Sequence, residues 1–111
     1  MAVAEEDTII VYATFPNIET ATEMATMLIN SRIAGCVNML PGMTSVYRWE
    51  GGVETAQEIV MIVKTRASLR GEIIAAIEQR HPYDTPAIVA WDINGGSRRY
   101  LDWIIGETKN S

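Results

Sequence analysis

The stretch Arg80-His81-Pro82-Tyr83-Asp84-Thr85-Pro86 separates a pattern typical of a helix from a pattern typical of a strand, and it holds the only histidine of the chain. Because proline disfavours helical geometry in the residue before it, the upstream helix must end near His81. Pro86 favours an extended exit. We therefore expect a short, stiff connection. It is either a rigid turn with a hydrogen-bonded histidine or a segment that presents a ligand.

Outward from this stretch, the apolar spacing predicts alternating strands and helices. Strands are expected at 8–15, 36–50, 53–65 and 87–93, and helices at 18–35, at 67–80 and after Ser97, with a bend at Pro41-Gly42 and a turn at Gly51-Gly52. The order β-α-β-β-α-β with an extra C-terminal helix predicts an α+β, ferredoxin-like sandwich with a long hairpin between its second and third strands. We expect one domain over 1–111, an ordered core at about 8–105, and frayed ends at 1–6 and 107–111.

The composition is that of a globular chain that needs no metal or disulfide in order to fold: 111 residues, 48% of them hydrophobic, with a net charge of −5. The acidic balance argues against nucleic acid or an anionic membrane as the main partner. The single Cys36 cannot form an internal disulfide, which favours a reducing compartment. The first residues have no basic start or apolar run of a leader, so we expect a cytoplasmic protein.

The strands predict self-association. The first, third and fourth strands are apolar on both alternating faces, although the two helices can cover only one face of the sheet. A hairpin with arms of about 14 residues would also span about 45 Å, far more than the radius of gyration of about 13 Å expected for a domain of this size. A second copy of the chain is the simplest cover for the remaining face and for the projecting hairpin.

The candidate metal ligands are His81 and Cys36, since imidazole and thiolate are common ligands of transition-metal ions and the chain offers one residue of each type. A specific site would need further donors, for which an assembly of several copies is one source. The competing interpretations are a packed histidine and a buried cysteine that acts as a small hydrophobe. No motif of a hydrolase, zinc protease or phosphate-binding loop is present. We therefore expect no enzyme, with a Cys36–His81 dyad as the minor alternative.

Lys64 is unusual because it ends a strongly apolar run, where an unpaired charge would be costly if it were buried. One interpretation is an ion pair with a carboxylate such as Glu58 or Asp84. The other is that Lys64 faces a cleft and holds an anion. The same cleft could be lined by three aromatic residues, for which core or interface packing is the alternative: Tyr47, Trp49 and Tyr83.

Six motifs in order resemble the CutA family of divalent-cation tolerance proteins, over residues 8 to 105. They are Ala34-Gly35-Cys36-Val37-Asn38, Leu40-Pro41-Gly42, Ser45-Val46-Tyr47-Arg48-Trp49-Glu50-Gly51, Val63-Lys64-Thr65-Arg66, His81-Pro82-Tyr83-Asp84-Thr85-Pro86 and Tyr100-Leu101-x-Trp103. The resemblance implies a homotrimer whose subunits pair their sheets edge to edge through the long hairpin, as in the architecture of the PII nitrogen-signalling proteins. It also implies a role in tolerance of copper and other divalent ions, with no firmly assigned reaction.

By position in these motifs, the resemblance carries a histidine role over to His81 and a cysteine role to Cys36. The chain departs from the family at Arg80, Ala13 and Ala87, where other members have histidine, cysteine and glutamate. The resemblance therefore implies a trimeric binding or signalling module in copper tolerance. The alternative is a PII-like sensor or scaffold that binds a small ligand in the cleft between subunits.

Overall fold

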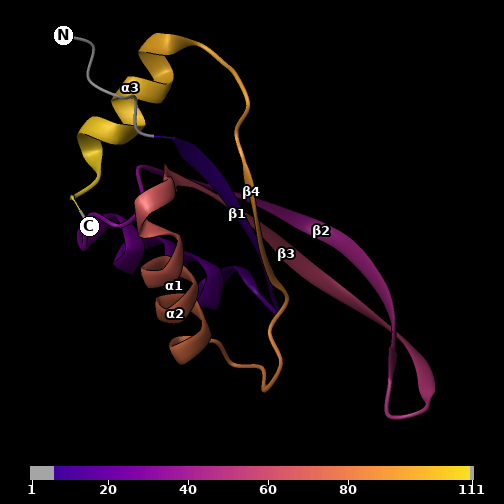
Figure 1. Cartoon of the computed structure of the whole chain (residues 1–111). Helices are drawn as coiled ribbons and strands as arrows, with labels where there is room; N and C mark the ends of the chain where they lie inside the picture. Colours follow the sequence, from indigo (N-terminus) through magenta and orange to yellow (C-terminus); the bar gives the residue numbers. More distant parts are fainter. Residues whose placement is uncertain (1–6, 111) are drawn as a thin grey trace, which may run out of the picture.

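One antiparallel sheet carries the fold, in the strand order β2-β3-β1-β4 (Figure 1). The computed structural model describes residues 7–110. Its strands are β1 (Thr8–Phe15), β2 (Cys36–Trp49), β3 (Gly52–Arg66) and β4 (Ile88–Asp92), and its helices are α1 (Ile18–Asn30), α2 (Arg70–Arg80) and α3 (Arg98–Glu107). A short 3₁₀ turn, η1 (Ala67–Leu69), replaces the first turn that we expected of the second helix. The α+β, ferredoxin-like prediction is confirmed.

Helix α1 begins as expected and ends earlier. The Asn17 side chain accepts a hydrogen bond from the backbone N–H of Thr20, which caps the first turn. The helix stops at Asn30 because Arg32 takes a positive φ of 62°, and not at Gly35 as the sequence suggested. Gly35 serves a different purpose, since a Cβ there would lie 3.2 Å from Ile104 of α3. A side chain at this position would push α3 away from the sheet.

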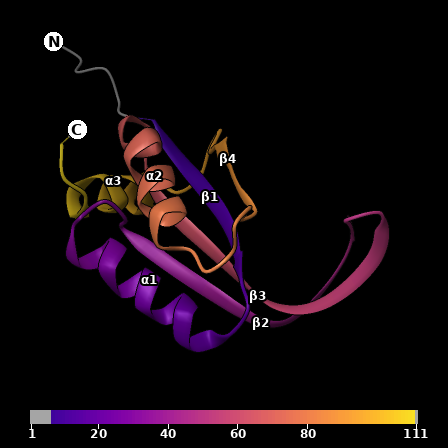
Figure 2. The ribbon, with the colours of Figure 1, turned by 90° about the horizontal axis from the view of Figure 1, so that it is seen from below.

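The β2–β3 hairpin projects from the body of the molecule (Figure 1). The register shifts between Leu40 and Met43, where Gly42 has a φ of 85°, so the expected bend at Pro41-Gly42 is a bulge. The turn is made by Glu50 and Gly51, with φ of 48° and 82°, and not by the expected pair of glycines. The arm curls away from the sheet (Figure 2) and lengthens the molecule to 57 Å against 26 and 22 Å.

Helices α1 and α2 lie against one face of the sheet, which we call the covered face (Figure 2). Alternate residues of β1 and β3 point into this layer and meet one apolar side of each helix. The core residues with the lowest exposure, all below 2%, are Ile9, Val11, Ala13, Phe15, Ala21, Leu28, Met61, Val63, Leu69, Ile73 and Ile77. A single chain therefore completes this face by itself.

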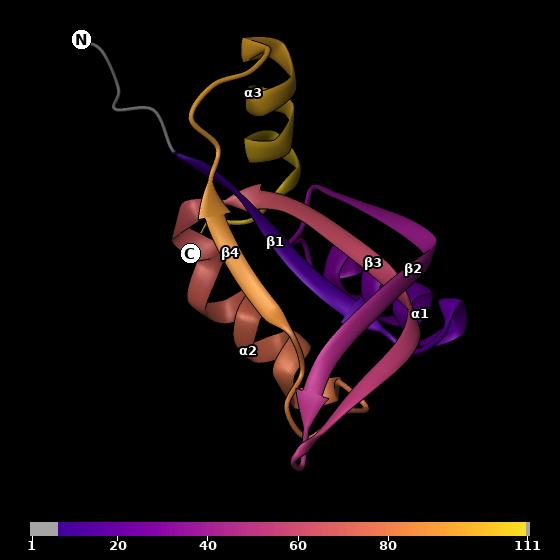
Figure 3. The ribbon, with the colours of Figure 1, turned by 90° about the vertical axis from the view of Figure 1, so that its right-hand side faces the viewer.

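The opposite side of the sheet, which we call the open face, is seen in Figure 3 with α1 and α2 behind it. Its cross-strand rows follow from the strand registers: Cys36, Lys64, Ile10 and Trp91, then Asn38, Ile62, Tyr12 and Val89, then Leu40, Val60 and Thr14. Most of these side chains are apolar, yet Leu40 is 56% and Val89 is 53% exposed. Within residues 7–110, α3 reaches this face at the end that carries Lys64, and Tyr83 reaches Glu58 beyond the buried Val60 and Thr14 at the other end.

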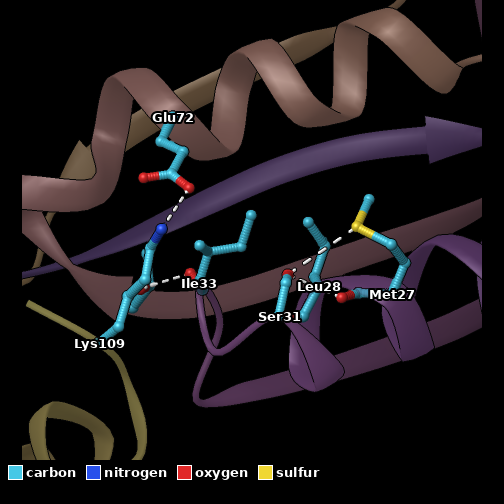
Figure 4. A network of polar contacts seen from close by, with 7 residues as sticks. Met27, Leu28, Ser31, Ile33, Glu72 and Lys109 are labelled. Carbon is cyan, nitrogen blue, oxygen red and sulfur yellow. Dashed lines mark hydrogen bonds and ion pairs between the residues drawn. The ribbon is translucent and has the colours of Figure 1, made fainter. Parts of the chain in front are cut away.

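The C-terminal residues are packed, in contrast to the frayed end expected at 107–111. Thr108 is buried, and the Arg66 guanidinium donates to its hydroxyl and carbonyl oxygens and to the carbonyl of Ile105. The Lys109 ammonium lies 2.7 Å from Glu72 of α2 (Figure 4). These contacts fix α3 across the end of the sheet. The expected fraying at 1–6 and at Ser111 lies outside the described residues.

Candidate functional site

His81 closes α2 and is held by both of its ring nitrogens. Its backbone is extended, as the following proline requires. Nε2 lies 2.6 Å from the carbonyl oxygen of Thr14, and Nδ1 accepts the N–H of Tyr83 at 3.1 Å. Because a carbonyl can only accept, Nε2 carries the proton and the ring is neutral. The lone pair that a metal ion would use is therefore engaged by Tyr83.

Aromatic packing and a carboxylate complete this region, which we call the His81 cluster (Phe15, Glu58, His81 and Tyr83). The His81 ring centroid lies 4.5 Å from that of Phe15 and 4.8 Å from that of Tyr83. The Tyr83 hydroxyl donates to the buried Glu58 carboxylate at 3.2 Å. Burial raises the pKa of Tyr83, and the negative charge of Glu58 raises it further. These contacts hold residues 80–86, the connection between α2 and β4, against β1 and β3.

A second group of polar side chains, the Lys64 cluster (Cys36, Asn38, Lys64 and Tyr100), lies at the opposite end of the open face. The half-buried Lys64 ammonium donates to Asn38 Oδ1 at 2.6 Å and lies 5.7 Å from the Tyr100 ring centroid. Cys36 Sγ is 3.8 Å from the same amide oxygen. Burial raises the pKa of Tyr100, with a further contribution from its contact with Cys36, while Lys64 acts in the opposite direction.

The two candidate metal ligands are not brought together. His81 binds the carbonyl of Thr14, while Cys36 belongs to the row of Ile10, which lies four residues away along β1. That separation corresponds to about 13 Å at about 3.3 Å per residue. A dyad of Cys36 and His81 within one chain is therefore not formed.

The other candidate residues also divide between separate regions. Lys64 and Glu58 lie six residues apart on β3, about 20 Å at the usual strand rise, so the considered ion pair is not formed. Asp84 forms no ion pair within residues 7–110 either. Tyr47 and Trp49 lie on the projecting arm, where both are exposed. Of the candidates for one cleft, Glu58 and Tyr83 are hydrogen-bonded, and Tyr47 lies near enough to Tyr83 to contribute to its raised pKa.

Asn38 and Tyr100 are the functional candidates that the sequence reasoning did not assign to a site. Asn38 shares a strand face with Cys36 two residues earlier, a relation that the period of two could have revealed. Tyr100 comes from α3, and nothing local in the sequence places that helix beside Lys64. The contact depends on how the C-terminal residues pack against Arg66.

Two general findings bear on the classes of function. Within residues 7–110, no three His, Cys, Asp or Glu side chains are grouped closely enough to hold a metal ion. No helix in that part of the chain is long and apolar enough to cross a membrane. A metal site that draws on one copy alone would therefore use fewer than three such ligands from the described residues.

The known proteins that this chain resembles have CutA or CutA1 in their names. The sequence profile described as CutA1 divalent ion tolerance protein matches residues 9–107. A chloroplastic CutA protein of Arabidopsis thaliana is 41% identical over 102 residues, which are 92% of this chain and 56% of that protein. The divalent-cation tolerance protein CutA of Thermus thermophilus is 42% identical over 95 residues, 86% of this chain and 92% of that protein.

The likeness extends to structure. The crystal structure of CutA1 from Oryza sativa has a TM-score of 0.93 to this chain at 40% sequence identity, and the match covers 96% of this chain and 97% of that one. Against the plant sequences from Arabidopsis and rice, the chain spans little more than half of their length.

Proposed function

Because the chain belongs to the CutA1 divalent ion tolerance protein family, we propose that it acts in tolerance of copper and related cations as a binding module of three identical copies. The observation that carries the proposal is the open face, a largely apolar sheet surface that a single chain leaves exposed. Contiguous apolar surface of this kind is typical of an interface, and a copy of the same chain supplies a matching surface.

The projecting hairpin supports the same assembly. Its arm offers unpaired strand edges, while β4 at the other side of the sheet offers a second free edge. Free edges favour pairing with a neighbouring chain. The arm also exposes Val46, Tyr47, Trp49 and Val53, which contact between copies would shield from water. The single thiol fits a reducing compartment, and the proposal places the module in the cytoplasm.

For copper, we propose Cys36 rather than His81 as the protein ligand. The thiol is half-buried on the open face, where copies of the chain would bring several such groups together, and thiolate is a soft ligand that suits copper. His81 would first have to break its bond from the Tyr83 N–H. Because Cys36 and His81 lie in different parts of the fold, substituting each of them separately shows which one binds copper.

Calorimetric titration of the apo protein with copper and with zinc tests this assignment. Cys36→Ser is expected to weaken copper binding by about tenfold or more, while His81→Gln leaves it within about threefold of wild type. A large loss in His81→Gln with none in Cys36→Ser would make histidine the ligand. Binding that survives both substitutions would exclude both residues.

Growth of cells that lack the endogenous gene, in medium with raised copper, tests the role itself. Wild type and Ile29→Glu, which changes an exposed residue on α1 outside the open face, are expected to restore growth. Val89→Glu places a charge in the middle of the open face and is expected not to restore it. If Val89→Glu were monomeric and still restored full growth, the proposal that the function needs assembly would be contradicted.

A second candidate is a PII-like sensor or scaffold that binds a small ligand beside the open face. The Lys64 cluster favours it, because a cation on an apolar surface is a natural anchor for a ligand. A thermal-shift screen of metabolites tests the idea. A compound that raises the midpoint for wild type would support it, and the absence of any stabilising compound would count against it.

A further inference from the structure

We infer that the Lys64 cluster is the subsite for a small aromatic carboxylic acid, whose carboxylate binds the Lys64 ammonium and whose ring packs on α3. The inference rests on the sensor function proposed as the second candidate, and it adds the chemical class of the ligand. It uses side chains of one chain only.

Among the described residues, no carboxylate serves as a counter-ion for Lys64. The chain has two lysines, and the other, Lys109, lies 2.7 Å from the Glu72 carboxylate. Lys64 forms no ion pair with any carboxylate of residues 7–110, and its neighbours in the open-face rows are Ile10 and Ile62. A half-buried ammonium beside apolar side chains loses hydration, and a neutral amide oxygen compensates only part of that loss. A bound anion would supply the missing charge.

The cluster also provides a neutral hydrogen-bond donor for the same anion. The Lys64 ammonium has three N–H groups, of which one is given to Asn38 Oδ1 at 2.6 Å. That bond fixes the orientation of the Asn38 amide, whose exposed NH₂ group can then donate to a ligand. The Tyr100 hydroxyl is engaged with Cys36 and Lys64, so the Asn38 amide is the neutral donor that remains for a ligand. One cation with this neutral donor matches the two oxygens of a monocarboxylate.

Helix α3 adds a second, independent feature at this point. Tyr100 is in the first turn of α3, the positive end of the helix dipole, and this turn contains no acidic residue. Next to it, Tyr100 and Trp103 are stacked with centroids 6.0 Å apart and planes 17° from parallel. Both rings are more than a third exposed. A flat ring can pack on this pair while its carboxylate reaches Lys64.

The cluster favours a carboxylate over a phosphate. Phosphate recognition commonly uses the planar fork of arginine, and none of the four residues of the cluster is an arginine. One ammonium balances one negative charge. The competing occupant is a carboxylate from a neighbouring copy, such as its Glu58, which lies on the same sheet face six residues before Lys64 in β3. The test must separate these two occupants.

The experiment uses benzoate as the probe, with the binding followed by NMR shifts of the Asn38 side-chain amide and the α3 backbone. Acetate has the charge without the ring, benzyl alcohol has the ring without the charge, and phosphate tests the other anion. Benzoate is expected to bind more tightly than each of the three by about threefold or more, since charge and stacking both contribute. Equal binding of phosphate and benzoate would overturn the assignment of the ligand class.

Substitutions then locate the site. Lys64→Gln is expected to weaken benzoate binding by about tenfold or more, and Lys64→Arg to keep it within about threefold, because the first removes the charge and the second retains it. Trp103→Leu removes one of the two stacked rings and should weaken benzoate binding while it leaves acetate binding unchanged. Lys109→Gln is the matched control, since it removes the other lysine, and it should bind as wild type does. Unchanged benzoate binding in Lys64→Gln would overturn the inference.

Two further outcomes separate this inference from the function on which it rests. A screened compound that still stabilises Lys64→Gln as it does wild type would leave the sensor function standing and overturn the site. Lower affinity between copies in Lys64→Gln, without any loss of benzoate binding, would assign Lys64 to a neighbour's carboxylate and overturn the subsite. If no compound bound, benzoate included, both the sensor function and the subsite would be contradicted.

Discussion

The two faces of the sheet differ in how far a single chain completes them. On the covered face, α1 and α2 bury alternate residues of β1 and β3 to exposures near zero. On the open face, Ile10 and Tyr12 of β1 are only half-buried, and the flanking strands β2 and β4 leave Leu40, Val89 and Trp91 about half exposed. The same run of apolar residues, such as Ile9-Ile10-Val11, thus supplies both a finished core and an unfinished surface.

The polar clusters show the same contrast. His81 satisfies both ring nitrogens and stacks against Phe15, so its polar atoms have partners within the chain. Lys64 has only neutral partners, Asn38 and Tyr100, and no counter-ion within residues 7–110. The difference teaches that the only histidine has a structural role in this chain, while the charge at the end of β3 is the feature that still requires a partner.

The largest expected effect is in the covered core. Ile77→Ala removes a fully buried side chain of α2 and leaves a cavity, which should lower the free energy of unfolding by about 2–5 kcal/mol. Ile29→Ala, on the outer side of α1, should cost less than about 1 kcal/mol. Denaturant titrations at equal protein concentration measure both. Equal losses would break the distinction between covered and exposed helix faces.

The next effect concerns the His81 cluster. His81→Ala leaves the Thr14 carbonyl and the Tyr83 N–H without their partners and should cost about 1–3 kcal/mol of unfolding free energy. Pro82→Ala, at the neighbouring exposed residue, is the control and should cost less in the same titration. If His81→Ala proved neutral, the histidine would be free for another role, and its structural assignment would fail.

Tyr83 gives a pH dependence with a defined sign. Its pKa is raised above 10.0 in the folded chain by burial and by Glu58, so the folded state retains a proton that the unfolded state releases. The stabilising contribution is complete below pH 10 and falls as the pH rises through the folded pKa. Denaturation between pH 8 and 11 should show a steeper decline for wild type than for Tyr83→Phe.

Glu58→Gln sharpens the same test. Removing the carboxylate takes away the charge and the hydrogen bond of Glu58 but leaves burial, the largest cause of the raised pKa of Tyr83, so the decline in stability above pH 10 should lie between those of wild type and Tyr83→Phe. Identical pH profiles for wild type and Tyr83→Phe would mean that Glu58 does not affect the pKa of the Tyr83 hydroxyl in solution.

The smallest expected effect is at the exposed ion pair of the C-terminal segment. Lys109→Gln breaks the 2.7 Å contact with Glu72. The side chains of both residues are more than 40% exposed. Such pairs contribute about 0–1 kcal/mol and are screened by salt. Thermal denaturation in low and high salt should show little difference between the variant and wild type. A loss above about 2 kcal/mol would mean that this contact holds α3 against the sheet.

Much of the fold could be predicted from short-range patterns. The doubly apolar β1, the end of α2 at His81 and the bulge at Pro41-Gly42 each follow from the conformational preferences of the residues themselves. The end of α1 could not be predicted, because Arg32 adopts a positive φ that is unusual for its residue type. The hairpin turn lies one residue earlier than expected for the same reason, since Glu50 also has a positive φ.

The candidate site was less predictable because it depends on contacts between distant elements. Lys64 was recognised as unusual, but its partner depends on the register of β2 against β3, which places Asn38 within reach. Tyr100 joins the cluster only because Arg66 and Thr108 fix α3 at the end of the sheet. For His81, the residue type indicated a ligand, whereas the occupied nitrogens follow from the packing of Thr14 and Tyr83.

The mass of the protein in solution tests most directly whether copies of the chain cover the open face. Sedimentation equilibrium of wild type and Ile29→Glu should give three times the 12.3 kDa of one chain, while Val89→Glu should give a folded species of lower mass. The reason is that Val89 is exposed in one chain and would be buried between copies. A wild-type mass of 12.3 kDa, or an unchanged assembly in Val89→Glu, would contradict the account.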